Sequence, residues 1–211
     1  MLNNILFITD DCDYEKEYSL KSKDSEGNKK RAKLEMIDAL KKLSPKVFCT
    51  YSIREANEYM IRNKNTFTVT TYYGEASPDS KSIIPSLCKT NKINYLGADA
   101  YTQMICNDKY LSKKIIEQFE LNSINSVLIY TPNNANELEE IKKLKLPLIV
   151  KPNFGGGSNG IMNCSYTSSY EEAFELVNTL YNYQNLPILV EEYIPGNESV
   201  SYTHLRAHET S

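Results

Sequence analysis

Residues 148–164 read LIVKPNFGGGSNGIMNC, in which two apolar runs flank a glycine loop. The first run indicates a buried strand that ends at Lys151 and Pro152. A second strand is predicted from Ile161 to Tyr166. Four of the eight glycines of the chain lie between residues 155 and 160, so this is where the backbone most needs freedom from a Cβ. We therefore predict a flexible loop that joins two strands as in a hairpin.

The glycine loop has three interpretations. Its spacing satisfies G-x-G-x-x-G, which in dinucleotide-binding folds opens a helix that faces the pyrophosphate. The interpretation as a nicotinamide-dependent oxidoreductase therefore predicts a helix directly after Gly160. The sequence favours a strand at that position. The second interpretation is a flap whose N–H groups close over phosphates, with Lys151 at its foot. The third is an ordinary glycine-rich hairpin turn.

The N-terminal part of the chain alternates strand and helix patterns, which predicts a parallel sheet. The predicted strands cover residues 2–9, 47–51, 67–73 and 93–96, and the predicted helices cover residues 31–43 and 53–61. The polar segments 10–30 and 74–81 are predicted loops. The second of these loops follows a strand end, where open α/β folds usually bind ligands.

A change of character after Leu96 predicts a domain boundary. Asp99 can cap one long helix with a buried apolar stripe from Tyr101 to Phe119. Ser169 and Glu172 form a capping-box pattern that opens a later helix. The other elements predicted here are a strand at 126–130, a helix at 137–144, a strand at 146–152 and a strand at 186–194. The fold class is α/β, with a Rossmann-like N-terminal domain followed by an α+β unit.

Composition and charge exclude several classes of protein. The net charge of −3 arises from 24 basic and 27 acidic residues spread along the chain, which does not favour nucleic acid as a partner. The N-terminal residues lack the basic start and long apolar stretch of a signal peptide or membrane span, so we expect a cytoplasmic protein. The scattered cysteines suggest neither a disulfide framework nor a zinc site: Cys12, Cys49, Cys88, Cys106 and Cys164.

Three motifs, in order, resemble the ATP-grasp region of D-alanine–D-alanine ligases: residues 107–109, 148–160 and 190–198. Residues 95–100, YLGADA, also resemble the entry of that family into its central domain. The resemblance implies a Rossmann-like pre-ATP-grasp domain at residues 1–96, a central ATP-grasp subdomain at 97–186 and the start of the C-terminal ATP-grasp subdomain at 187–200.

The resemblance implies one set of ATP-binding residues: Lys109, Lys151, Gly156, Gly157, Ser158, Glu191, Glu192, Tyr193, Ile194 and Glu198. The two lysines would bind the phosphates, and the glycines and the serine would belong to the flap. Glu191 would accept a hydrogen bond from the adenine amino group, and Glu198 would hold the ribose hydroxyls. Glu15 and Ser158 are the candidate catalytic residues, because Glu15 resembles the glutamate that binds the amino group of the first D-alanine.

The implied reaction is the ligation of a carboxylate to an amine in two steps. ATP phosphorylates the carboxylate to an acylphosphate, and the amine then displaces the phosphate. ATP and Mg²⁺ are the implied cofactors, an amino acid is the small-molecule substrate, and peptidoglycan biosynthesis is the implied role of a possible homodimer. Residues 9–13 replace glycines of the family, and Thr70 and Thr71 stand where it has His-Gly. A ligase for another amino acid or peptide, and a non-catalytic ATP-binding protein, therefore remain alternatives.

The end of the sequence departs from the family after Val200. The family continues there through a β-rich segment that carries an arginine and the magnesium ligands, so we expect an ATP-grasp domain that is incomplete at its C-terminus, an inactive fragment and no assignable magnesium ligand. Residues 201–211, SYTHLRAHETS, resemble adapter read-through and predict a non-native or disordered tail. His204 and His208 could chelate a metal within a helix, but no third ligand is evident.

Overall fold

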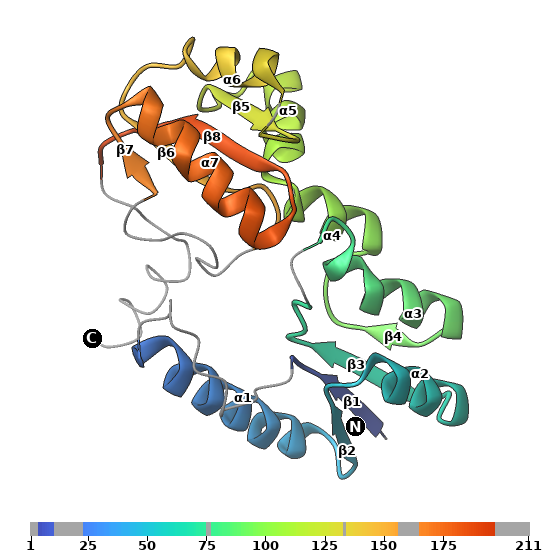
Figure 1. Ribbon diagram of the computed structural model, residues 1–211. Helices are drawn as coiled ribbons and strands as arrows, with labels where there is room; N and C mark the ends of the chain where they lie inside the picture. Colours follow the sequence, from blue (N-terminus) through green and yellow to red (C-terminus); the bar gives the residue numbers. More distant parts are fainter. Residues whose placement is uncertain (1–3, 11–22, 75–76, 133, 156–164, 197–211) are drawn as a thin grey trace, which may run out of the picture.

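The computed structural model describes residues 4–10, 23–74, 77–132, 134–155 and 165–196, with side chains described from residue 33 onward within α1. Within these residues the strands form two four-stranded sheets, each with its own helices (Figure 1). The predicted α/β class is confirmed. The two units are connected through α4, which lies between them along the chain and contacts η1 of the first unit.

The first sheet is parallel, as predicted, with strand order β2-β1-β3-β4. Its unit consists of β1 (Asn4–Ile8), α1 (Lys23–Leu43), β2 (Val47–Thr50), α2 (Ile53–Arg62), β3 (Thr66–Thr70), the 3-10 helix η1 (Ser80–Ser82), α3 (Ile83–Asn91) and β4 (Asn94–Tyr95). No helix was predicted at the position of α3.

Helices cover both faces of the first sheet (Figure 1), and the alternation of side chains along β1 explains why. Ile5 and Phe7 point to the face covered by α1, where they pack with Leu40. Leu6 and Ile8 point to the opposite face and pack with residues of α2 and α3. A strand buried on both faces reads as a continuous apolar run, which is the pattern found in the sequence.

The predicted loop at residues 10–30 is wrong in its last part, because α1 begins at Lys23. The helix prediction relied on a stripe of apolar residues at helical spacing, and this part of α1 has almost no apolar residues. Residues 29–33, KKRAK, have good intrinsic helix propensity, whereas Asp24, Ser25, Gly27 and Asn28 do not, so propensity explains the helix only from about Lys29. Propensity extends the helix here beyond the region marked by apolar periodicity.

The second unit contains a mostly antiparallel sheet with strand order β5-β8-β6-β7. It consists of α4 (Ala100–Asn107), α5 (Lys109–Gln118), β5 (Ser126–Ile129), α6 (Ala135–Ile141), β6 (Leu148–Pro152), β7 (Tyr166–Thr167), α7 (Tyr170–Gln184) and β8 (Ile188–Glu192). Because β7 is the next described element after the glycine loop and pairs antiparallel with β6, the loop joins two hairpin strands. A dinucleotide-binding unit requires parallel strands there, so that interpretation is wrong.

One face of the second sheet packs against α6 and α7. Val150, Ile188 and Val190 lie on this face and form the core together with apolar side chains of the two helices. Ser169 caps α7 as predicted, since its hydroxyl oxygen accepts a hydrogen bond from the backbone N–H of Glu172 at 3.3 Å. The other half of the predicted capping box is not formed, because the N–H of Ser169 donates to the Thr167 hydroxyl and the Glu172 carboxylate accepts from that same hydroxyl. The alternate residues of β6 and β8 consequently point to the other face of the sheet.

The helix predicted from Asp99 to Phe119 is in fact two helices, α4 and α5. Asp99 caps the first as predicted, but the backbone of Asp108 is extended, with φ −92° and ψ 102°, and this residue caps α5. The predicted buried stripe is also wrong, because Tyr101 is 74% exposed and Phe119 is 72% exposed. The break therefore has a cause other than the burial of an apolar face.

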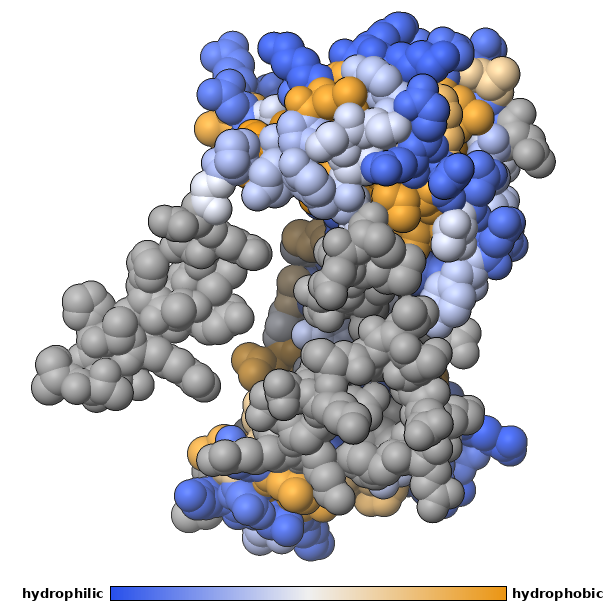
Figure 2. Space-filling model, turned by 60° about the vertical axis from the view of Figure 1, so that its left-hand side comes forward, coloured by the Kyte–Doolittle hydropathy of each residue, from blue (hydrophilic) through white to orange (hydrophobic). Residues whose placement is uncertain are grey.

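The surface of the described residues is mixed in character. Figure 2 shows hydrophilic side chains over much of the second unit, at the top of the view, interrupted by smaller hydrophobic areas. No helix in the described ranges is both long enough and apolar enough to cross a lipid bilayer.

Candidate functional site

Two charged side chains lie on neighbouring strands, on the sheet face away from α7. Lys151 is near the end of β6 and Glu191 is near the end of β8, and the antiparallel register places them diagonally across the strand pair. Nζ of Lys151 donates a hydrogen bond to Oε1 of Glu191. The Glu191 side chain is only 7% exposed, so this ion pair is largely removed from water.

A second lysine reaches the same carboxylate from α5. Nζ of Lys113 donates to Oε2 of Glu191 at 2.5 Å and to the carbonyl oxygen of Ile124 at 3.4 Å. Burial raises the pKa of Glu191, but the hydrogen bonds from the two lysines outweigh this effect and hold the pKa below its ordinary value. Glu191 is thus an ionised, buried carboxylate with a cation at each oxygen.

Lys109 begins α5 and anchors the start of the glycine loop. Its ammonium group donates to three backbone carbonyl oxygens, those of Pro152 at 3.0 Å, Asn153 at 3.1 Å and Gly155 at 3.0 Å. An ammonium group has three N–H donors, so these contacts use all of them. Lys109 therefore fixes the chain as it leaves β6 and places a positive charge beneath the first residues of the loop.

The neighbours of Lys109 explain the break between α4 and α5. Asn107 is 1% exposed; it donates to the carbonyl oxygen of Ser77 at 2.8 Å and accepts from the N–H of Gly155 at 3.2 Å. Oδ1 of Asp108 accepts from the side chain of Asn153 at 2.8 Å. A continuous helix could not present these successive side chains to one segment. The motif thus ties the start of the glycine loop to the first unit.

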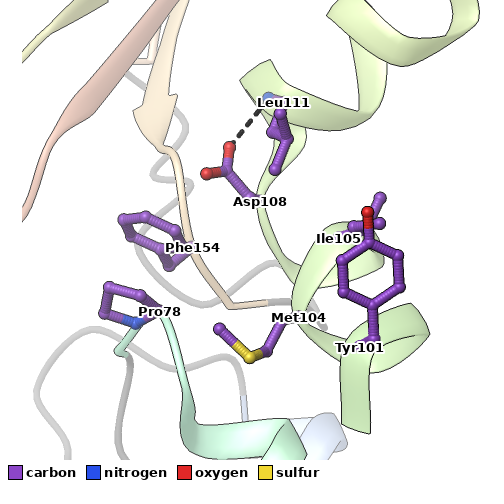
Figure 3. A pocket seen from close by; sticks show the side chains of 7 residues that line it. All are labelled: Pro78, Tyr101, Met104, Ile105, Asp108, Leu111 and Phe154. Carbon is purple, nitrogen blue, oxygen red and sulfur yellow. Dashed lines mark hydrogen bonds between the residues drawn. The ribbon is translucent and has the colours of Figure 1, made fainter. Parts of the chain in front are cut away.

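A small apolar pocket of about 140 Å³ lies next to this break (Figure 3). It is lined by Pro78, Tyr101, Met104, Ile105, Asp108, Leu111 and Phe154. Its one charged residue, Asp108, accepts from the N–H of Leu111 at 2.9 Å, which is the dashed line in Figure 3. The lining is too apolar to bind phosphates, so we do not assign the pocket to a nucleotide.

We predict an unusual titration for Lys109. Burial, together with the nearby charges of Lys151 and Lys81, lowers its pKa from 10.5 to about 8. In the unfolded chain Lys109 keeps its proton up to about pH 10.5, whereas in the folded chain it loses that proton near pH 8. The free energy of unfolding should therefore increase as the pH rises from about 8 to 10.5. NMR titration of ¹³C-labelled lysines should show a midpoint near pH 8 that is missing from Lys109→Arg; a midpoint of 10.5 for this residue would contradict the prediction.

The structure brings three of the predicted ATP-binding residues together, namely Lys109, Lys151 and Glu191. Adjacent Glu192 points to the opposite sheet face, as strand alternation predicts, and accepts from the N–H of Lys145 at 2.9 Å. Other predicted residues follow directly on β8: Tyr193, 40% exposed, and Ile194, 64% exposed. The remaining predicted site residues lie outside the described residues: Glu15, Gly156, Gly157, Ser158 and Glu198.

Sequence reasoning missed Lys113. A signal for it was present, because Lys109 and Lys113 are four residues apart and residues at this spacing share one face of a helix. The prediction of one long helix with a buried apolar stripe assigned no role to Lys113.

The site and the fold together define the class of protein. Residues 108–210 match the family described as "Carbamoyl-phosphate synthase L chain, ATP binding domain". The second unit has a mostly antiparallel sheet, and the charged groups of Lys109, Lys151 and Glu191 lie near the end of β6, where Lys109 contacts Gly155. Over these residues the chain is similar to proteins of the ATP-grasp superfamily.

Within this superfamily the chain resembles D-alanine–D-alanine ligases. The ligase of Wigglesworthia glossinidia brevipalpis is 27% identical over 163 residues, which is 74% of this chain and 45% of that protein. The crystal structure of the Bacillus anthracis ligase has a TM-score of 0.68 at 21% identity, covering 92% of this chain and 58% of that one. A structure of the same ligase complexed with ATP has a TM-score of 0.67 at 19% identity and covers 93% and 58%. The chain spans about half the length of these relatives.

Proposed function

We propose that the chain provides the nucleotide-binding part of an ATP-dependent carboxylate–amine ligase of the D-alanine–D-alanine ligase type. The observation that carries this proposal is the buried Glu191 carboxylate between Lys113 and Lys151, beside the start of the glycine loop. An ionised acceptor next to lysine ammonium groups suits a ligand that has a hydrogen-bond donor at one end and phosphates at the other.

The charges of the site support the binding of phosphate. Lys81, Lys109, Lys113 and Lys151 supply four positive charges, whereas Asp108 and Glu191 supply two negative charges, so positive charge is in excess. Phosphoryl transfer needs positioning and charge stabilisation more than a covalent protein nucleophile. These residues would hold the ATP while the acylphosphate forms and the amine displaces its phosphate.

The substrate and the metal are less defined by the described residues. Relatives named as D-alanine–D-alanine ligases favour an amino acid as substrate, and Glu15 and Ser158 are proposed to contribute to catalysis. The part of the chain described by the structure contains no group of three potential metal ligands, so it offers no fitting magnesium site and we derive no step through that ion. A cytoplasmic location and a homodimer are further parts of the proposal.

The Lys151→Ala variant tests nucleotide binding. Removing one partner of a largely buried charge pair should weaken ATP binding about 30-fold or more, as measured by isothermal titration calorimetry on the 211-residue chain. Lys143→Ala is the matched control, because that side chain is 69% exposed and pairs with Glu140 on the surface. Equal ATP affinity in both variants would remove Lys151 from the site.

Turnover needs a separate measurement on the full-length product of the gene. The ligase proposal predicts ADP release that depends on an amino acid and is lost in Lys151→Ala. If this protein binds ATP but releases no ADP with any amino acid or dipeptide, the alternative of a non-catalytic ATP-binding protein is supported instead.

A further inference from the structure

The Glu191 carboxylate has two cationic partners that differ in their surroundings. Lys113 belongs to a regular helix, and its ammonium group also donates to the carbonyl oxygen of Ile124. Lys151 lies one residue from the end of β6, just before the glycine loop. The side chains are 15% and 19% exposed respectively, so both are mostly buried but retain some contact with water.

Nucleotide binding would affect the two lysines differently. Phosphates bound near Lys109 at the end of β6 would attract the ammonium group of Lys151, because Lys151 lies at that strand end and Lys113 lies on α5. Glu191 would then lose one of its two charged partners while it stays buried. A buried carboxylate without a counter-ion is strongly unfavourable, so the second lysine becomes more important in the nucleotide-bound state than in the free state.

We propose that Lys113 is a positioning residue that remains the counter-ion of Glu191 when Lys151 turns to the phosphates, and that it thereby fixes an anionic acceptor for the amino group of adenine. This inference rests on the proposed function. Lys113 acts through Glu191 and needs no contact with the nucleotide. It holds Oε2, which leaves Oε1 available to the base once Lys151 has moved.

The arrangement has a consequence for the choice of base. Adenine presents an amino group, which donates to a carboxylate, whereas hypoxanthine presents a carbonyl oxygen at the same position. An ionised, fixed Glu191 should therefore bind ATP and reject ITP, since two acceptors would face each other in a buried site. A carboxylate that has lost its fixed partner could turn away or take up a proton, and it would discriminate less.

The experiment compares ATP and ITP binding to the 211-residue chain by calorimetry. In Lys113→Met, ATP affinity should fall about tenfold or more, and the ratio of ATP to ITP affinity should fall towards one. Lys113→Arg should restore most of the ratio because it keeps the charge. Lys114→Met is the matched control, because this neighbouring lysine is 45% exposed and pairs with Glu117 on the same helix. The ratio of ATP to ITP affinity in this variant should equal that of the wild type.

Each outcome decides the inference. An unchanged ratio in Lys113→Met, or an equal loss of both nucleotides, overturns it. Should Lys113→Met fail to fold, as judged by circular dichroism, Lys113→Gln keeps a hydrogen-bond donor without the charge, and the same change in ratio is required of it. A wild-type chain that binds neither nucleotide counts against the proposed function, whereas wild-type ATP preference with an unchanged variant ratio counts against the role of Lys113 alone.

Discussion

Replacement of Glu191 by alanine is expected to lower the free energy of unfolding by about 3 kcal/mol and to abolish ATP binding. The change leaves the ammonium groups of Lys113 and Lys151 next to each other without the carboxylate that now separates them. Breaking a buried ion pair costs about 3–5 kcal/mol, and the partial exposure of the lysines places this variant at the lower end of that range. Urea denaturation followed by circular dichroism measures the change.

Glu139→Ala is the control for this variant. Its carboxylate is 66% exposed and pairs with Lys142 on the surface of α6, and such pairs contribute less than about 1 kcal/mol. If Glu191→Ala were as stable as Glu139→Ala, the carboxylate would not be the centre of the charge cluster, and the assignment of this sheet face to nucleotide binding would lose its main support.

The second large effect is expected from Phe7→Ala in β1. The Phe7 side chain is 0% exposed and packs against Leu40 of α1. Truncation of a buried phenylalanine to alanine lowers the free energy of unfolding by about 3–5 kcal/mol. Hydrogen exchange measured by mass spectrometry should show faster exchange in β1, β2 and β3. Exchange in β6 and β8 should change little, because these strands belong to a separate sheet with its own core.

Phe48→Ala provides the comparison on the neighbouring strand. Phe48 is 37% exposed and stacks on Tyr59 at 4.5 Å between ring centroids, so its loss removes less buried area. A destabilisation by Phe48→Ala equal to that by Phe7→Ala would show that the core of the first unit is not centred on β1.

Strands and capped helices could be predicted from the sequence because each has a local signal. Continuous apolar residues marked β1 and β6, and Ser169 with Glu172 marked the start of α7. The start of α1 could not be found in this way, since it has no apolar stripe. The break at Asp108 was missed because its cause is not local: the partner Asn153 is 45 residues further along the chain.

The candidate site likewise contains residues that have a signal in the sequence and contacts that depend on distant parts of the chain. Lys151 and Glu191 could be singled out from motif order, and the structure places them in contact; their role in ATP binding stays a prediction. The spacing of Lys109 and Lys113 places both on one helix face, but nothing in the sequence shows that this face and a strand 78 residues away share one carboxylate. Contacts of this kind depend on how α5 packs on the sheet, which requires the tertiary structure.

The order of strands in the second sheet determines when that sheet can form during synthesis. The last strand that the structure describes, β8, occupies an interior position between β5 and β6. The first sheet can be complete once Tyr95 has left the ribosome, whereas the second has to wait for Glu192. At usual translation rates of about 5–20 residues per second, the nascent chain exposes the unpaired edges of β5 and β6 for seconds before β8 arrives. Chaperone binding to the emerging chain is therefore expected to concentrate on this region.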